Sequence, residues 1–281
     1  MKNYIYKLLF SVLFITASCT DVIDLEVPEA PPRLVIEASI DWIKGTAGNQ
    51  QSVKLSTSTP FFDNLQETPV KGAIVKVIND SDKNEVVFID QNNGNYETDE
   101  FIPIIGQSYT LEIIYDNETY LASETMTPVT EINAVYQSRE NGFDKEALEV
   151  NIEFNDPKDI SNFYLTKFQR RGDLFQTIFD VKDEFTDGNK ISIFYEKLNN
   201  EDTGETEFVP GDIVDISLLG ISEQYFNYIK LLIQQSGGQG GPFSTTPAEI
   251  KGNCINLDNP NNYAFGYFRL TEVDEKVYLF E

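Results

Sequence analysis

The sequence predicts a mainly β protein, and three observations lead to this prediction. Short segments alternate between apolar and polar residues with a period of two, as strands do when one face is buried. Clusters of Asn, Asp, Gly and Pro separate these segments at short intervals, where turns are expected. Only one long segment shows the apolar spacing of an amphipathic helix. The 20 Phe and 14 Tyr residues supply bulky side chains for a packed core.

A first β domain is predicted over residues 34–127. Its strands are expected at residues 34–40, 52–58, 70–78, 85–89, 108–115 and 119–125, with one more starting at Tyr96. Short strands without helical periodicity favour an antiparallel β-sandwich. The order of Gly72-Ala73, Asn93-Gly94-Asn95-Tyr96 and Gly106 resembles immunoglobulin-like or transthyretin-like modules of secreted bacterial proteins. That resemblance implies a fold and carries no activity.

A second domain, β-rich with at least one packed helix, is predicted over residues 128–281. Thr127-Pro128-Val129 interrupts the strand pattern and marks the boundary. The helix is expected at about residues 223–236, because Ser222 can cap its first turn and Gly237-Gly238 can end it. Further strands are expected at residues 148–154, 163–168, 191–195, 212–219, 264–270 and 276–280.

The first 18 residues are predicted to be a lipoprotein signal peptide. Lys2 and Lys7 flank the start of an apolar run, residues 8–15, that is too short to span the roughly 30 Å hydrocarbon core of a bilayer. Small residues follow, as at a secretory cleavage site. Thr16-Ala17-Ser18-Cys19 resembles a bacterial lipobox, which implies cleavage between Ser18 and Cys19 and diacylation of Cys19. The alternative is an ordinary signal peptide beside an incidental cysteine.

Residues 19–33 are predicted to be an acidic, proline-rich tether. Three prolines at positions 28, 31 and 32 favour extended backbone. Asp21, Asp24 and Glu26 follow the lipid site, and acidic residues there resemble a surface-export signal of Bacteroidota lipoproteins. We therefore expect a lipid-anchored protein of the outer membrane, at the cell surface or otherwise on the periplasmic face.

Charge and composition exclude several classes of function. The formal net charge is −25 at pH 7, so the surface repels phosphates and nucleic-acid binding is not expected. The chain has no histidine, which removes Ser–His–Asp and Cys–His catalysis and histidine-ligated metals. If Cys19 is acylated, Cys254 has no internal partner and is expected to be a buried, inert thiol. We predict no enzyme activity, no catalytic residues and no cofactor.

Calcium is the one metal for which the sequence offers candidates, Asp183 and Asp187. They lie in the run 183–189, which lacks the alternating ligands of an EF-hand. A hairpin turn between Phe179 and Ile191 explains the run equally well. We therefore predict no metal site. If calcium does bind, Asp183 and Asp187 are its candidate ligands.

A collinear series of segments resembles the Bacteroidota lipoprotein family catalogued as domain of unknown function 4249. The series comprises Cys19 with Asp21 and Glu26, then residues 34–38, 69–75, 93–96, 221–228, 242–243, 253–256, 259–260 and 266–268. The resemblance implies an outer-membrane lipoprotein encoded beside a TonB-dependent transporter. The implied role is to capture a ligand for that transporter or to act as its lid, and no catalytic residue is transferred.

The predicted function is therefore that of a non-enzymatic accessory protein in nutrient uptake, with the outer membrane and a TonB-dependent transporter as partners. Two alternatives are kept. A surface hydrolase of the glycosidase type needs no histidine but requires two carboxyl groups roughly 5–10 Å apart. An adhesion or scaffold module is favoured if neither domain has a concave pocket.

Overall fold

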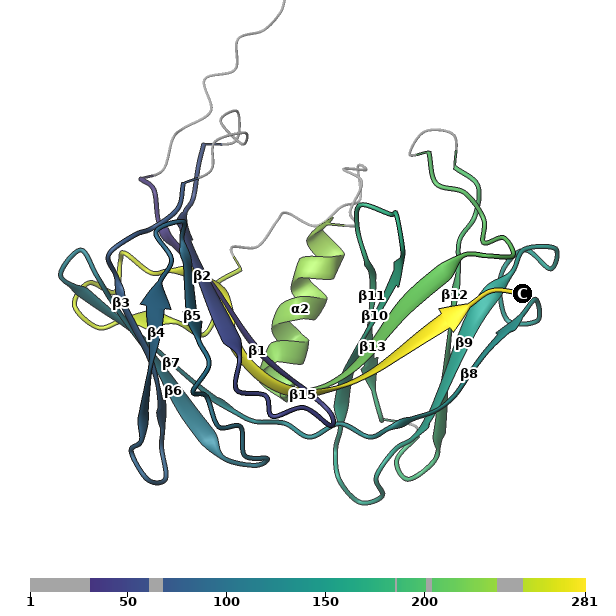
Figure 1. Cartoon of the computed structure of the whole chain (residues 1–281), viewed down its shortest axis with the longest axis horizontal. Helices are drawn as coiled ribbons and strands as arrows, with labels where there is room; N and C mark the ends of the chain where they lie inside the picture. The colour runs from purple at the N-terminus through teal and green to yellow at the C-terminus, as the bar shows by residue number, and fades with distance from the viewer. Residues whose placement is uncertain (1–30, 61–67, 185, 201–203, 237–249) are drawn as a thin grey trace, which may run out of the picture. The chain divides into compact units, whose positions relative to one another are not determined.

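The computed structural model describes residues 31–60, 68–184, 186–200, 204–236 and 250–281 (Figure 1). The first part of the chain forms β1 (Leu34–Ile43), β2 (Gln51–Thr57), β3 (Ile74–Asn79), β4 (Glu85–Asp90), β5 (Asn95–Thr98), β6 (Ser108–Tyr115) and β7 (Glu118–Thr125). The rest forms β8 (Ile132–Ser138), β9 (Glu149–Asn155), β10 (Phe163–Arg170), β11 (Thr177–Lys182), β12 (Lys190–Glu196), β13 (Ile213–Ile221), α2 (Glu223–Ser236), β14 (Ile255–Asn256) and β15 (Phe265–Leu279). The predicted mainly β fold is confirmed.

The strands form two sheets. The larger has twelve strands in the order β11-β10-β13-β15-β1-β2-β5-β4-β3-β6-β7-β14, and the smaller has the order β12-β9-β8. Most neighbouring strands are antiparallel, but β1 and β15 are parallel over the register Val35 to Phe265 through Ile43 to Val273. The first and last strands of the described chain are therefore paired in the middle of the large sheet.

The first sandwich is formed by the strands from β1 to β7 in the large sheet, which curls back on itself so that these strands enclose one core. Alternate residues of β2, Gln51, Val53 and Leu55, point into its core, as a strand with one buried face requires. β6 and β7 are joined through Asp116 and Asn117, which both have positive φ, the backbone that a two-residue hairpin turn of the favoured type needs. The strands predicted at residues 108–115 and 119–125 thus form a hairpin.

The core of the first sandwich includes residues from the end of the chain. Cys254, Ala264, Phe268 and Leu270 belong to the same buried cluster as the side chains of β1 to β7. The predicted boundary at residues 127/128 stays a prediction, and the C-terminal contribution to the first core was not anticipated. Cys254 is buried, as expected, and burial raises the pKa of its thiol to about 12, so the reactive thiolate is not populated at neutral pH.

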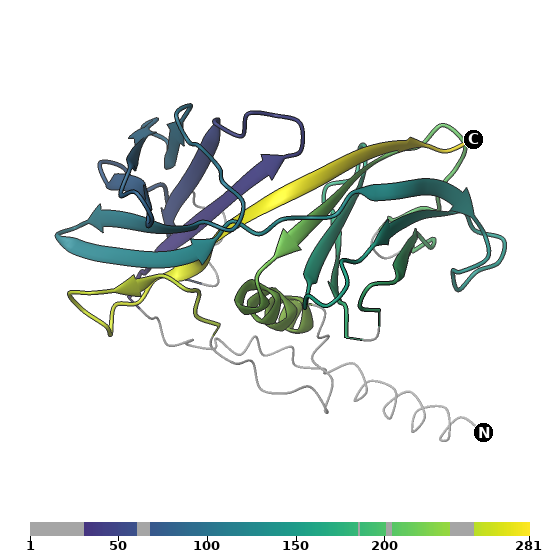
Figure 2. The same ribbon diagram turned by 90° about the horizontal axis from the view of Figure 1, so that it is seen from below.

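In the second sandwich, the small sheet packs on β10, β13 and the end of β15. Val150, Ile152 and Phe154 of β9 share a buried cluster with Phe168 of β10 and Phe280. The two segments predicted as separate strands at residues 264–270 and 276–280 are one 15-residue strand, β15, which pairs with β1 in its first part and with β13 in its second. Figure 2 shows β15 running from the strands of the first sandwich to those of the second.

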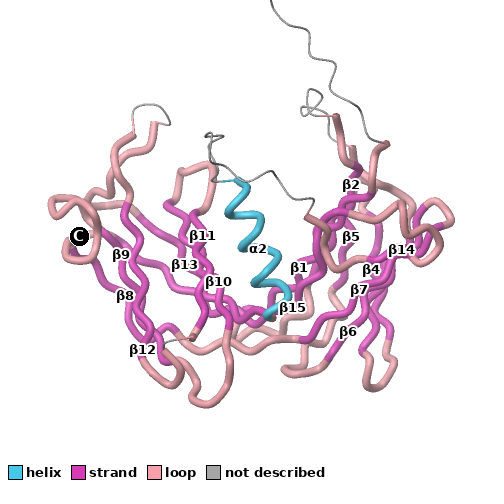
Figure 3. Tube along the Cα trace, turned by 180° about the vertical axis from the view of Figure 1, so that it is seen from behind, coloured by secondary structure: helices cyan, strands magenta, loops and turns pink. Residues whose placement is uncertain are grey.

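The predicted helix is confirmed as α2, the one α-helix in the described part of the chain (Figure 3). The Ser222 hydroxyl accepts a hydrogen bond from the backbone N–H of Tyr225 at 3.1 Å, as an N-cap does. Phe226 is buried in a cluster with side chains of β10, β13 and β15, whereas Leu232 is 36% exposed. No helix in the described ranges has the length and apolar character needed to cross a membrane.

Candidate functional site

A cleft of about 980 Å³ opens between the edges of β11 and β12 in the second sandwich. β11 ends the large sheet and β12 ends the small one, so neither strand has a further partner among the described residues. Phe179 and Val181 of β11 and Ile193 of β12 belong to the edge of the core and stay only partly buried. The cleft is lined by Phe143, Thr177, Phe179–Val181, Ser192–Asn200 and Glu205.

Tyr195 and Phe179 line the cleft, and buried rings of the second sandwich's core pack behind them in tilted and edge-to-face contacts. Tyr195 is at the centre of these contacts, with ring centroids 5.2 Å from Phe168, 6.1 Å from Phe179 and 5.3 Å from Phe208. The Thr177 hydroxyl donates a hydrogen bond to the Tyr195 hydroxyl at 3.0 Å and ties β11 to β12 across the cleft. Such aromatic contacts bury a large apolar area and favour particular ring geometries, so the side of the cleft around Tyr195 is apolar and closely packed.

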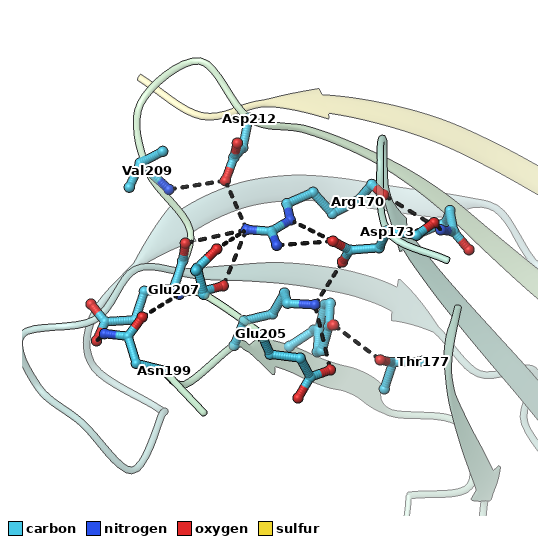
Figure 4. Close-up of polar contacts among 12 residues, drawn as sticks. Arg170, Asp173, Thr177, Asn199, Glu205, Glu207, Val209 and Asp212 are labelled. Carbon is cyan, nitrogen blue, oxygen red and sulfur yellow. Dashed lines mark hydrogen bonds and ion pairs between the residues drawn. The ribbon is translucent and has the colours of Figure 1, made fainter. Parts of the chain in front are cut away.

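An ion-pair network closes one end of the cleft (Figure 4). Lys197, only 5% exposed, lies 2.6 Å from Asp173, which also accepts a 2.9 Å hydrogen bond from Arg170. Burial alone would lower the pKa of Lys197, but its hydrogen bond to Asp173 raises that pKa above the ordinary value. Arg170 also lies 3.4 Å from Asp212, and Lys197 lies 3.7 Å from Glu205. Both cations at this end are therefore held by carboxylates of the protein.

Two paired glutamates hold the loop that forms the rim of the cleft. Glu149 of β9 and Glu196 of β12 lie opposite one another in the small sheet. Glu196 accepts hydrogen bonds from the backbone N–H groups of Phe143 at 2.8 Å and Asp144 at 3.0 Å. Glu149 is fully buried and accepts from the Asn141 backbone at 2.9 Å and from the Ser138 hydroxyl. The loop so fixed presents the Phe143 ring, 89% exposed, at the mouth of the cleft.

Glu149→Gln is expected to destabilise the fold by about 1.5–3 kcal/mol at neutral pH, because hydrogen bonds to charged groups contribute about that much. Burial would raise the pKa of Glu149, but hydrogen bonds from Ser138, Asn141 and Asn151 outweigh it and lower that pKa. A lowered carboxyl pKa stabilises above the unfolded value and is lost as pH falls through the folded value. The difference between wild type and variant should therefore shrink below about pH 4.5.

Urea denaturation at neutral pH and at about pH 3.5 measures this difference. Glu153→Gln is the matched control, since Glu153 lies on the same strand but pairs with the well-exposed Lys190, and it should cost less than about 1 kcal/mol. Equal losses for both variants, or a Glu149→Gln effect that persists at low pH, would contradict the role assigned to Glu149.

The structure brings the two predicted calcium candidates together and adds a third aspartate. Single oxygens of Asp156, Asp183 and Asp187 lie within 4.8 Å of one another. Oxygen donors of this kind suit Ca²⁺, although three carboxylates supply only part of its usual six to eight ligands. Asp156 also accepts the Tyr164 hydroxyl at 2.6 Å, and Asp183 accepts the Asn162 backbone N–H at 2.6 Å. The prediction of no metal site is untested, and Asp183 and Asp187 remain its calcium candidates. Asp156 was missed because it follows β9 in the sequence, far from the run 183–189.

Carboxylates also line a second hollow, of about 960 Å³, in the first sandwich. Glu97, Asp99 and Glu100 lie there with Asp41, which is 2.7 Å from the buried Arg269. In the cleft of the second sandwich, both oxygens of Glu196 accept loop amides. The hydrolase alternative and the non-enzymatic prediction both stay predictions. The predicted cleavage and lipidation residues, Ser18 and Cys19, lie outside the described residues.

Comparisons with known proteins give one family match and distant structural likenesses. The family model described as "Domain of unknown function (DUF4249)" matches residues 20–277. Among curated proteins, none matches this chain significantly.

The chain is similar to three solved structures at low identity. A two-domain fibronectin type III segment of chicken tenascin is 13% identical, covers 67% of this chain and 90% of its own, and has a TM-score of 0.21. The chicken interferon gamma receptor alpha chain is 13% identical, with coverages of 68% and 90% and a TM-score of 0.21. A DUF4785 family protein from Legionella pneumophila is 10% identical, with coverages of 66% and 51% and a TM-score of 0.25.

Proposed function

This chain belongs to the DUF4249 family, because the family model matches its residues 20–277. On this basis we propose that it is a lipid-anchored accessory protein of the outer membrane. In this proposal it captures a ligand for a TonB-dependent transporter and has no catalytic role. Cys19, directly after the small residues of the signal, supports the anchor, and the acidic tether supports a position at the cell surface.

The open cleft between β11 and β12 is the main observation that supports a role in ligand capture. It combines about 980 Å³ of space with a closely packed aromatic surface and a polar end, which is the usual make-up of a ligand site. Adhesion or scaffolding needs no such cleft, so the cleft favours capture over those alternatives. Phe143, exposed at the mouth, is the residue best placed to meet a bound molecule or the transporter.

Photo-crosslinking in native membranes tests this proposal. A photoreactive residue at Phe143 should crosslink to an outer-membrane β-barrel protein, since the cleft has to face the transporter that receives its ligand. The same residue at Ile255, which is 59% exposed on β14 of the first sandwich, is the control and should give little of that product. Recovery of the protein free in the periplasm, with no barrel crosslinked from Phe143, would refute the proposed role.

A further inference from the structure

The two strands that border the cleft have free edges in the described part of the chain. β11 pairs with β10 only, and β12 pairs with β9 only. In antiparallel pairs, alternate residues direct their N–H and C=O groups away from the partner, so each edge offers backbone donors and acceptors. β11 has six residues. An added strand of about that length, at roughly 3.3 Å per residue, would extend about 20 Å.

The side chains of β11 specify what an added strand must carry. Phe179 and Val181 point toward the second core, whereas Ile178 packs with the cluster under α2 on the opposite face. Asp180 and Lys182 follow Ile178 at a period of two and so share its face, and Lys182 lies 3.6 Å from Glu184. A strand paired with β11 would therefore place every second side chain in the cleft beside Phe179 and Val181, and the others beside Asp180. The peptide side chains beside Phe179 and Val181 need to be apolar.

The charges around the cleft favour a basic ligand. Three carboxylates, those of Asp180, Glu196 and Glu205, line it with one cation, Lys197, which is bound by Asp173 and lies 3.7 Å from Glu205. The whole chain carries a formal charge of −25, which attracts cations and repels anions. Opposite charges on neighbouring strands stabilise pairing, and like charges oppose it.

We propose that the cleft binds a short, extended, free peptide in which apolar residues alternate with Lys or Arg, added as a strand to the edge of β11. The inference rests on the proposed role in ligand capture and names its ligand class. Backbone hydrogen bonds to β11 hold the peptide, and the aromatic surface around Tyr195 selects its apolar side chains, as in other cases of strand addition.

The test measures binding of fluorescent hexapeptides to the purified, lipidated protein in detergent, with empty micelles subtracted. The probes alternate Lys with Phe, Val or Ile. Two further sets carry N-methyl groups on either the odd or the even backbone amides. An added strand uses only one edge to pair with β11, and a one-residue slip would turn its apolar side chains out of the cleft. One methylated set should therefore lose about tenfold in affinity or more, while the other binds as the parent does.

Charge-reversal variants locate the site. Asp180→Lys should weaken binding of the basic probes by about fivefold or more, because it puts like charges on neighbouring strands. Glu131→Lys, at an exposed position outside the cleft, makes the same change in net charge and should alter binding by less than about twofold. Hexapeptides with Glu in place of Lys should not bind.

The inference is overturned if the basic probes do not bind, if both methylated sets bind like the parent, or if the two charge reversals have equal effects. These outcomes are separable from the crosslinking result. Peptide binding without a crosslinked barrel would leave this inference standing and refute the transporter role. A crosslinked barrel without peptide binding would support the transporter role and refute this inference.

Discussion

Replacing Cys19 by alanine is expected to release essentially all of the protein from the membrane. The proposed anchor is the acylated Cys19, and each buried methylene of a lipid chain contributes about 0.8 kcal/mol, so two or more chains give stable attachment. The folded part starts beyond the tether, with Leu34 as the first strand residue, so the released protein should keep its thermal unfolding midpoint. Alkaline washing of membranes followed by immunoblotting measures the released fraction.

Cys254→Ala is the matched control for the anchor. It removes the other cysteine of the chain, a buried thiol in the first core, and leaves the lipidation site intact. This variant should stay in the membrane fraction and lose only about 1 kcal/mol of stability through the small cavity it creates. A Cys19→Ala protein that resists the alkaline wash would show that something other than this cysteine holds the chain to the membrane.

Gly266→Ala is expected to destabilise the fold by about 3–5 kcal/mol, a large part of the roughly 5–15 kcal/mol that stabilises an ordinary domain. Gly266 has φ +93°, where a side chain adds strain of about 1–2 kcal/mol. A Cβ at this position would also lie 2.0 Å from the Ile36 carbonyl oxygen on the parallel strand β1. The nearest atoms are all backbone atoms of Ile36, so no flexible side chain can move aside. The β1–β15 pairing itself therefore has to shift.

Gly211→Ala separates these two costs. Gly211 has a similar φ of +99°, but a Cβ there meets nothing within 4 Å. It should therefore lose only the conformational part, about 1–2 kcal/mol. Chemical denaturation of both variants measures the difference. If both lose the same amount, then the close approach of β1 to Gly266 contributes nothing, and the pairing between the two ends of the chain is looser than described.

Local features of the fold could be predicted because their causes are local. The period-two alternation of β2, the two-residue turn at Asp116-Asn117 and the cap at Ser222 all depend on neighbours within a few residues. β8 and β11 were not among the predicted strands. Five of the six β11 residues are half-buried, so the strand shows little contrast between its two faces.

The candidate site could not be predicted, because it depends on pairings between distant residues. The cleft exists only because β11 and β12 end different sheets, and no pattern within either strand reveals that. The same holds for Glu149 and Glu196, which are 47 residues apart in number and become partners through the β9–β12 register. Acidic residues are abundant in this chain, so no local pattern singles out these two.

The pairing of β1 with β15 sets the order in which the protein can mature. Synthesis delivers β1 before β15, yet the first core is incomplete without Phe268 and Leu270 of β15. An N-terminal sandwich would ordinarily fold as soon as it emerges. Here it has to wait for the C-terminal end, and such a long-range closure is intrinsically slow. Both sandwiches can therefore become complete only after β15 has been made, which suits the export proposed for this chain.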